Sequence, residues 1–167
     1  MALADTRFSN RRRKLASELA GQRIDAVVVT HLTHVRYLSG FSGSNGGLLL
    51  RKDLSALMAT DGRYTTQIAE EVPDLEAVLG RDVGPHLLST LEGELRVGYE
   101  ADYVSVSQLE RLKKAAPDGA TLVPVSGVIE KIRLVKDPIE LEKLEEIAAL
   151  ANQAVSYTHL TLPTKRI

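Results

Sequence analysis

The sequence predicts an α/β fold, a mixed β-sheet with helices on both faces. Three observations favour this fold. Short apolar segments of strand character alternate along the chain with segments whose apolar residues recur at helical spacing. The run from Asp25 to Thr30 is β-branched and continuously apolar, which suits a strand that is covered on both sides. The chain has 167 residues, 44% hydrophobic and 26% charged, which is the length and balance of one globular domain.

The first half of the chain is expected to begin with a helix that ends at Gly21. Ser39 to Gly47 is rich in glycine and serine, which tolerate unusual backbone angles, and is expected to be a loop. Two apolar runs around a polar connection follow and predict a hairpin. The expected elements are a helix at Arg7–Ala20, a strand at Asp25–Thr30, a helical turn at His31–Leu38, strands at Leu48–Leu50 and Ala56–Ala59, and a helix opened by Thr60–Tyr64 that continues through Glu71.

The second half continues the alternation, and its helix starts are the best marked. Ser105 and Gln108 have the spacing of a capping box. Asp137 can cap the last helix, with Pro138 at its first position and Glu140 completing the box. The expected elements are strands at Leu75–Leu79, Leu95–Tyr99 and Thr121–Val125, helices at Pro85–Leu91 and from Ser105, a short helix at Val128–Leu134, and a long helix whose apolar stripe is Leu141, Leu144, Ala148, Ala151 and Val155.

Composition excludes several classes of function. The absence of cysteine removes disulfides, thiolate metal sites and cysteine nucleophiles. A net charge of -1 and few aromatic residues give no reason to expect nucleic acid as a partner. The one basic run, Arg11 to Lys14, is expected on the solvated face of a helix. No secretory signal or membrane segment is recognised, so the expected location is the cytoplasm, without a membrane partner.

Few residues have the spacing of a catalytic or metal site. His31 and His34 share one face of a helical turn and could bind a metal together, but no further ligand stands beside them in the sequence, so ordinary structural histidines are favoured. Neither Ser42 nor Ser44 lies in a nucleophile elbow, and the glycines match neither a P-loop nor a dinucleotide fingerprint. The loop glycines either supply turns alone or also let the loop touch a ligand.

Thr60-Asp-Gly-Arg-Tyr64 places a carboxylate, a guanidinium and a phenol within one turn at a strand end, where α/β domains present ligands. Arg63 could clamp a carboxylate, or Asp61 could cap the helix while Arg63 forms an internal ion pair with a neighbour. From the residues alone, the internal pair is slightly favoured.

Four segments together resemble the amino-terminal domain of Xaa-Pro aminopeptidases and prolidases, the creatinase/prolidase type. They are Arg36-Tyr-Leu-Ser-Gly-Phe-Ser-Gly-Ser-Asn-Gly46, Ala59-Thr-Asp-Gly-Arg-Tyr64, Val97-Gly-Tyr-Glu-Ala101 and Ile132-Arg-Leu-Val-Lys-Asp-Pro-Ile-Glu140. The resemblance implies a ribonuclease H-like mixed sheet. It also implies a separate catalytic domain that holds two divalent metal ions, expected to be manganese, through five Asp, Glu and His ligands.

By this resemblance the chain itself has no catalytic residue, no metal ligand and no cofactor. Its implied role is to shape substrate access and to support oligomerisation in a Xaa-Pro metallopeptidase. The implied partners are its own catalytic domain, a second subunit in a homodimer, and proline-containing peptides. The residues expected near substrate are Phe41, Ser42, Gly43, Ser44, Asn45, Asp61, Arg63 and Tyr64.

The expected domain organisation has three parts. Residues 1–136 form the creatinase/prolidase-type domain, 137–155 form a helix that leads to a catalytic domain, and 156–167 form a tail that departs from the family pattern and resembles an artefactual reading frame. This tail is expected to be disordered or to extend the helix. Two alternatives remain open: a non-catalytic interaction module, as in the prolidase-like domains of histone chaperones, or the amino-terminal domain of a creatinase-type amidinohydrolase.

Overall fold

The computed structural model describes residues 6–161, with side chains through residue 155. The chain forms two compact units, one reaching Ile132 and one beginning at Arg133, and each is described by itself. The elements are α1 (Thr6–Ala20), β1 (Ala26–Val29), α2 (Leu32–Ser39), β2 (Gly46–Arg51), β3 (Ala56–Thr60), the short 3-10 helix η1 (Gly62–Tyr64), α3 (Thr65–Glu71), β4 (Glu76–Leu79), α4 (Val83–Leu88), β5 (Arg96–Glu100), α5 (Val106–Ala115), β6 (Thr121–Val125), α6 (Val128–Leu134) and α7 (Pro138–Thr161).

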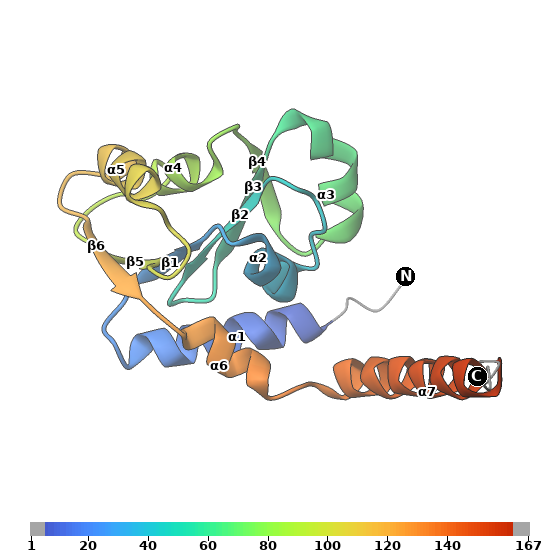
Figure 1. Cartoon of the computed structure of the whole chain (residues 1–167). Coiled ribbons are helices and arrows are strands. Elements are labelled where there is room, and N and C mark those ends of the chain that lie inside the picture. The colour runs from blue at the N-terminus through green and yellow to red at the C-terminus, as the bar shows by residue number, and fades with distance from the viewer. Residues whose placement is uncertain (1–5, 162–167) are drawn as a thin grey trace. The chain divides into compact units, whose positions relative to one another are not determined.

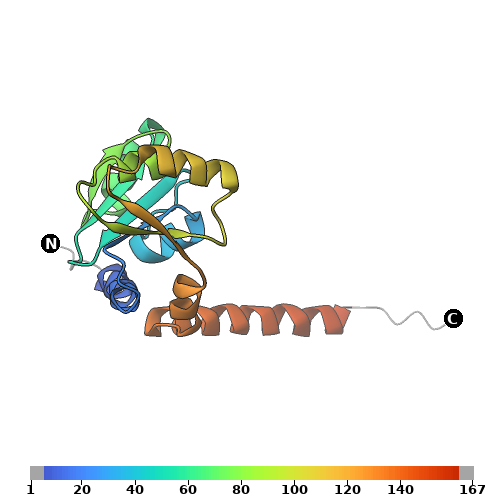
Figure 2. The same ribbon diagram turned by 90° about the vertical axis from the view of Figure 1, so that its left-hand side faces the viewer.

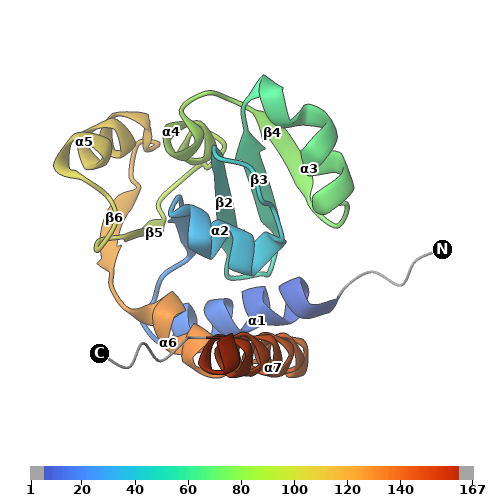
Figure 3. The same cartoon turned by 45° about the vertical axis from the view of Figure 1, so that its right-hand side comes forward.

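The first unit is built on a six-stranded mixed sheet of order β4-β3-β2-β1-β5-β6. Only β2 runs against its neighbours, since it pairs antiparallel with both β1 and β3, whereas the other pairs are parallel. Figure 3 shows β2, β3 and β4 side by side with α3 beside them. The predicted α/β fold with a mixed sheet is therefore confirmed.

Helices cover both faces of the sheet (Figures 1 and 2). One core joins α1, α2, α3 and α6 to one side of the central strands; its members include Leu15, Leu38 and Ile129. The other core joins α4 and α5 to the opposite side, through Leu87 and Leu112 among others. Successive residues of β1 point into opposite cores. Val27 and Val29 enter the core with α1, and Ala26 and Val28 enter the core with α4. This two-sided burial explains why β1 is a continuous apolar run.

The basic run of α1 is on the solvated face only in part: Arg13 and Lys14 are exposed as expected, but Arg11 and Arg12 are buried. Arg11 and Arg12 are only 7% and 6% exposed. The Arg11 guanidinium donates to the carbonyl of Tyr37 and lies 4.1 Å from that residue's ring centroid. Arg12 donates to the carbonyl of Leu38 and forms an ion pair with Asp74. Both side chains therefore hold α1 against the end of α2.

Two element boundaries also differ from the expectation. Gly46 and Gly47 belong to β2, not to the loop, because they pair with Thr60 and Ala59 in the antiparallel ladder. Helix α4 begins at Val83, before Pro85, and ends at Leu88. Among the described residues, no helix is both long and apolar enough to cross a membrane.

The second unit consists mainly of α7, whose start follows the predicted capping box. The Glu140 amide donates to the Asp137 carboxylate at 2.9 Å, and the Asp137 amide donates to the Glu140 carboxylate at 3.0 Å. Helix α7 extends through Thr161, so the expected tail begins within it, and residues 162–167 lie outside the described part of the chain. Several large apolar side chains of α7 are exposed: Leu141, Leu144, Ile147, Leu150 and Val155.

Candidate functional site

The expected substrate-proximal residues gather at one edge of the sheet. The parallel strands β1, β3, β4, β5 and β6 all end at this edge, and β2 begins there. Ligands of open α/β sheets bind outside the carboxyl ends of such strands. The loop that precedes β2 and the turn that follows β3 meet at this edge through hydrogen bonds.

The loop Phe41–Asn45 is fixed by its aromatic residue. Phe41 is 1% exposed and packs edge-to-face on Tyr64, with ring centroids 5.7 Å apart. A Cβ on Gly43 would stand 2.3 Å from the Phe41 ring, so only glycine allows this close approach. Gly40 ends α2 with a φ of 88°, a left-handed conformation that suits glycine. Packing and turn geometry therefore both contribute to the choice of glycine here.

Asn45, Asp61 and Arg63 form a linked polar group. The Asn45 amide donates to Asp61 Oδ2 at 2.7 Å, and Arg63 donates from Nε and Nη2 to the two Asp61 oxygens at 2.9 and 2.8 Å. The Arg63 guanidinium, followed by the Asn45 amide, lowers the pKa of the Asp61 carboxyl. Asp61 also caps η1 by accepting from the Arg63 amide. The internal ion pair that the sequence favoured therefore forms, although the Arg63 side chain stays 69% exposed.

Tyr64 and Ser44 complete the contact between the loop and the turn. Their hydroxyl oxygens are 2.6 Å apart. This hydrogen bond is the main reason why the pKa of the Tyr64 phenol is lowered. The Arg63 guanidinium carbon also lies 5.2 Å from the centroid of the Tyr64 ring.

Glu71 is a member of the site that sequence reasoning missed, because the sequence identifies it only as part of a helix. Ser42 donates to its carboxylate from the backbone amide at 2.7 Å and from the hydroxyl at 2.6 Å, and Gln67 donates to it at 3.0 Å. Burial alone would raise the pKa of Glu71, but the hydrogen bonds from Ser42 and Gln67 outweigh it and lower the pKa. Both loop serines thus bind a carboxylate or a phenol, which is not the arrangement of a serine nucleophile.

Two clefts border this group. One, of about 650 Å³, is lined by Asp61, Gly62, Arg63, Leu79, Gly80 and Arg81. The other, of about 290 Å³, lies between the loop and helices α4 and α5, and its lining includes Ser44, Asn45, Arg81 and Arg111. Both clefts therefore adjoin the polar group; they share Arg81, and each is lined by two arginines.

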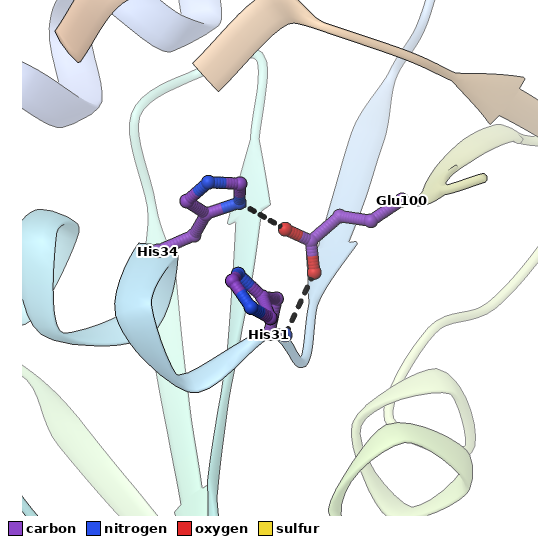
Figure 4. A group of neighbouring side chains, drawn as sticks. All are labelled: His31, His34 and Glu100. Atoms are coloured by element: carbon purple, nitrogen blue, oxygen red, sulfur yellow. Dashed lines mark hydrogen bonds and ion pairs between the residues drawn. The ribbon is translucent and has the colours of Figure 1, made fainter. Parts of the chain in front are cut away.

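A second polar cluster, His31, His34 and Glu100, lies at the same edge (Figure 4). His34 Nδ1 donates to Glu100 Oε1 at 2.6 Å. Glu100 Oε2 accepts the backbone amides of Thr30 and His31 at 2.7 and 2.9 Å. The sequence suggests that the two histidines lie together, but it does not identify Glu100 as the third member of the cluster. Glu100 is 66 positions from His34 and lies at the end of another strand.

Comparison with known proteins places this architecture in a family. The Creatinase/Prolidase N-terminal domain family matches residues 11–135. The chain belongs to this family. It is 34% identical over 137 residues to YqhT of Bacillus subtilis (strain 168), described as an uncharacterized peptidase; the match covers 78% of this chain but only 37% of YqhT.

Solved structures agree with this assignment. The N-terminal creatinase/prolidase-like domain from Corynebacterium diphtheriae is 60% identical, with a TM-score of 0.72 over 73% of this chain and 98% of that domain. The N-terminal domain of the cytoplasmic peptidase PepQ from Mycobacterium tuberculosis H37Rv is 41% identical, with a TM-score of 0.69 over 74% of this chain and 98% of that domain. The Xaa-Pro dipeptidase from Bacillus anthracis is 26% identical, with a TM-score of 0.83 over 93% of this chain and 44% of that chain.

Proposed function

We propose that this chain is the non-catalytic N-terminal domain of a Xaa-Pro metallopeptidase. We further propose that its loop edge, formed by the loop Phe41–Asn45 and the turn Asp61–Tyr64, shapes substrate access. The observation that carries the proposal is the 41% identity to the N-terminal domain of a peptidase, over 98% of that domain. The dipeptidase relative, of which this chain covers 44%, supports a catalytic region outside the part represented here. The substrates proposed are peptides that contain proline.

The chemistry is assigned to that other region because these residues do not fit a two-metal centre. Two metal ions that share a hydrolytic site need several Asp, Glu and His ligands converging at about 3.5–4 Å between the ions. The described residues bring together one group of at least three such side chains, His31, His34 and Glu100. Three side chains do not supply the five metal ligands that a two-metal centre of this family is expected to have. The proposed pair of manganese ions therefore belongs to the catalytic domain.

Arg63 is the residue proposed to meet substrate. Its guanidinium is already oriented by Asp61, and its side chain is 69% exposed beside the cleft that Arg81 also lines. An oriented guanidinium can bind a carboxylate through two parallel hydrogen bonds. The proposed role is to position the peptide, without activating water, from the edge that faces the active site of a neighbouring subunit. A cytoplasmic homodimer is part of the same proposal.

The test joins this domain to the catalytic region of a peptidase of the family and replaces Arg63. Arg63→Ala should lower kcat/KM for a Xaa-Pro substrate about tenfold or more, because a lost positioning contact of about 1.4 kcal/mol appears in transition-state binding. Arg63→Lys should restore only part of the rate, since a point charge does not reproduce a planar fork. Metal content should not change.

The matched control is Arg13→Ala, because Arg13 is an exposed arginine on α1 that donates a hydrogen bond to the Asn10 side chain. This variant should keep full activity. Full activity in folded Arg63→Ala would contradict the proposed role. A variant that no longer folds would instead assign Arg63 to structure, as the partner of Asp61.

A further inference from the structure

The cluster of His31, His34 and Glu100 occupies a special position in the sheet. Strands β1 and β5 are parallel neighbours. The helix that follows β1, α2, packs on one face of the sheet, and the helix that follows β5, α5, packs on the other. In open α/β sheets such a divergence opens a crevice at the carboxyl ends of the two strands, and ligands bind there. His31 comes just after β1, and Glu100 ends β5.

The three side chains offer three metal-binding atoms in a buried place. One ligand atom from each of His31, His34 and Glu100 lies within 4.8 Å of the other two. His34 is 1% exposed and Glu100 is 5% exposed. The two amides that bind Glu100 fix its carboxylate in orientation. Such outer hydrogen bonds are what orient carboxylate ligands around bound metals.

His34 has a ring nitrogen that the protein does not satisfy. Its Nε2 is buried without a hydrogen-bond partner and stands 3.8 Å from a carboxylate oxygen of Glu130. A buried polar atom left in this state costs about 1–3 kcal/mol. A cavity of about 10 Å³ adjoins it, lined by His34, Glu100 and Glu130 among others. This volume is about that of one water molecule.

The surroundings of the cavity are negatively charged. Asp102 and Tyr103 line it together with Glu100 and Glu130. The pKa of the Tyr103 phenol is raised, chiefly by its hydrogen bond to Glu130, then by burial and by the charges of Glu130, Asp102 and Glu100. The Tyr103 ring also stacks on His31, with centroids 3.8 Å apart. A cation placed here would be favoured by all three carboxylates.

We propose that His31, His34 and Glu100 form a binding site for one divalent transition-metal ion of the zinc class. Two imidazoles and a carboxylate suit zinc better than magnesium or calcium. The ion would replace the proton between His34 Nδ1 and Glu100, and that proton would move to His34 Nε2, so that the imidazole stays neutral with one N–H. His34 Nε2–H would then donate to Glu130, as ligating histidines commonly donate to a carboxylate. A water molecule would be the fourth ligand, as in zinc sites with three protein ligands.

The required movement is modest. Ligands about 2.1 Å from a tetrahedral zinc ion stand about 3.4 Å apart. The His34–Glu100 contact of 2.6 Å would therefore open slightly, and ligand atoms that now lie up to 4.8 Å apart would draw closer together. Because the cavity has no room for a peptide, the role of the ion is structural: it ties the end of β5 to the start of α2.

Calorimetric titration of the full chain with zinc tests the site. One ion should bind saturably, whereas magnesium should give no comparable binding and manganese should bind far more weakly than zinc. His31→Ala should weaken zinc binding at least tenfold; it keeps the backbone amide that holds Glu100, so the fold should survive. Glu130→Gln should also weaken zinc binding, about 10–100-fold, as the loss of an outer carboxylate does.

The control is His86→Ala, because His86 lies on α4, outside the cluster. This variant should bind zinc like the unmodified chain.

Nuclear magnetic resonance of the unmodified chain makes the result independent of any variant. Zinc should shift the ring signals of His31 and His34 and leave those of His86 in place. Absence of saturable binding would overturn the proposal and leave the cavity to a water molecule. Binding that shifts only His86 or other histidines would overturn it equally, as would a folded His31→Ala chain that binds zinc with unchanged affinity.

Discussion

At the scale of single residues, Arg12 joins α1 to two segments far away in the chain. It donates to the Leu38 carbonyl, 26 positions away, and pairs with Asp74, 62 positions away. Arg12→Ala should lower the free energy of unfolding by about 1.5–3 kcal/mol, the usual range for hydrogen bonds to a charged group. Chemical denaturation measures this. Arg13→Ala, on the exposed side of the same helix, should change it by less than about 0.5 kcal/mol, and equal losses in both variants would contradict the burial of Arg12.

Gly43 is predicted to be required by packing. Any Cβ there would meet the Phe41 ring at 2.3 Å, and this ring is fully enclosed and cannot swing away. Gly43→Ala should therefore destabilise the first unit by about 1–3 kcal/mol, as overpacking commonly does. Gly62→Ala is the control, since a Cβ on Gly62 meets nothing within 4 Å. Similar stabilities for the two variants would show that the loop yields without cost.

Asp61 predicts a defined pH dependence. Its folded-state pKa lies below the ordinary value of 3.8, because Arg63 and Asn45 bind the charged carboxylate. The stabilisation is therefore present above about pH 4 and is lost as the pH falls through the folded-state pKa. Asp61→Asn should be less stable than the unmodified chain at pH 7, and the difference should shrink at pH 3. Denaturation at both values checks this, and a difference that grows on acidification would have the wrong sign.

At the scale of elements, the capping box of α7 is the clearest local device. Asp137→Ala removes the acceptor of the Glu140 amide and should weaken the start of α7 by about 0.5–2 kcal/mol. The apolar side chains along α7 are exposed, so the loss should appear as reduced helical circular dichroism. Unchanged helical signal in Asp137→Ala would mean that the cap contributes nothing.

The strands were predictable because each is a short apolar run with a polar or glycine-rich boundary. Ala26–Val29 needed only its own β-branched residues to be recognised. The helix starts at Ser105 and Asp137 were predictable for the same local reason, since a capping box spans four positions.

The residues that sequence reasoning placed wrongly or missed all depend on distant partners. Arg11 and Arg12 looked like a solvated run because their acceptors are carbonyls at the end of α2. Glu71 looked like an ordinary helical glutamate until Ser42, 29 positions away, was seen to bind it. Glu100 reaches His34 only because β5 pairs with β1. No local sequence pattern predicts that β5 pairs with β1.

At the scale of the whole molecule, the loop edge and the His31–His34–Glu100 cluster divide the carboxyl edge of the sheet between two proposed tasks. The loop edge presents an arginine beside an open cleft of about 650 Å³. The cluster adjoins a much smaller cavity of about 10 Å³. Of these two spaces, only the cleft has room for part of a peptide. Substrate access is therefore proposed at the cleft, and a structural ion at the cluster.

The most direct measurement of the central claim is a peptidase assay on the isolated chain. Xaa-Pro dipeptides and longer peptides are incubated with the purified chain and manganese, cobalt or zinc, beside controls with the metal alone. We predict no turnover above those controls, because the chain does not gather the ligands of a two-metal centre, and turnover once the domain is joined to a catalytic region of the family. Hydrolysis by the isolated chain that persists through exhaustive purification would contradict a non-catalytic domain.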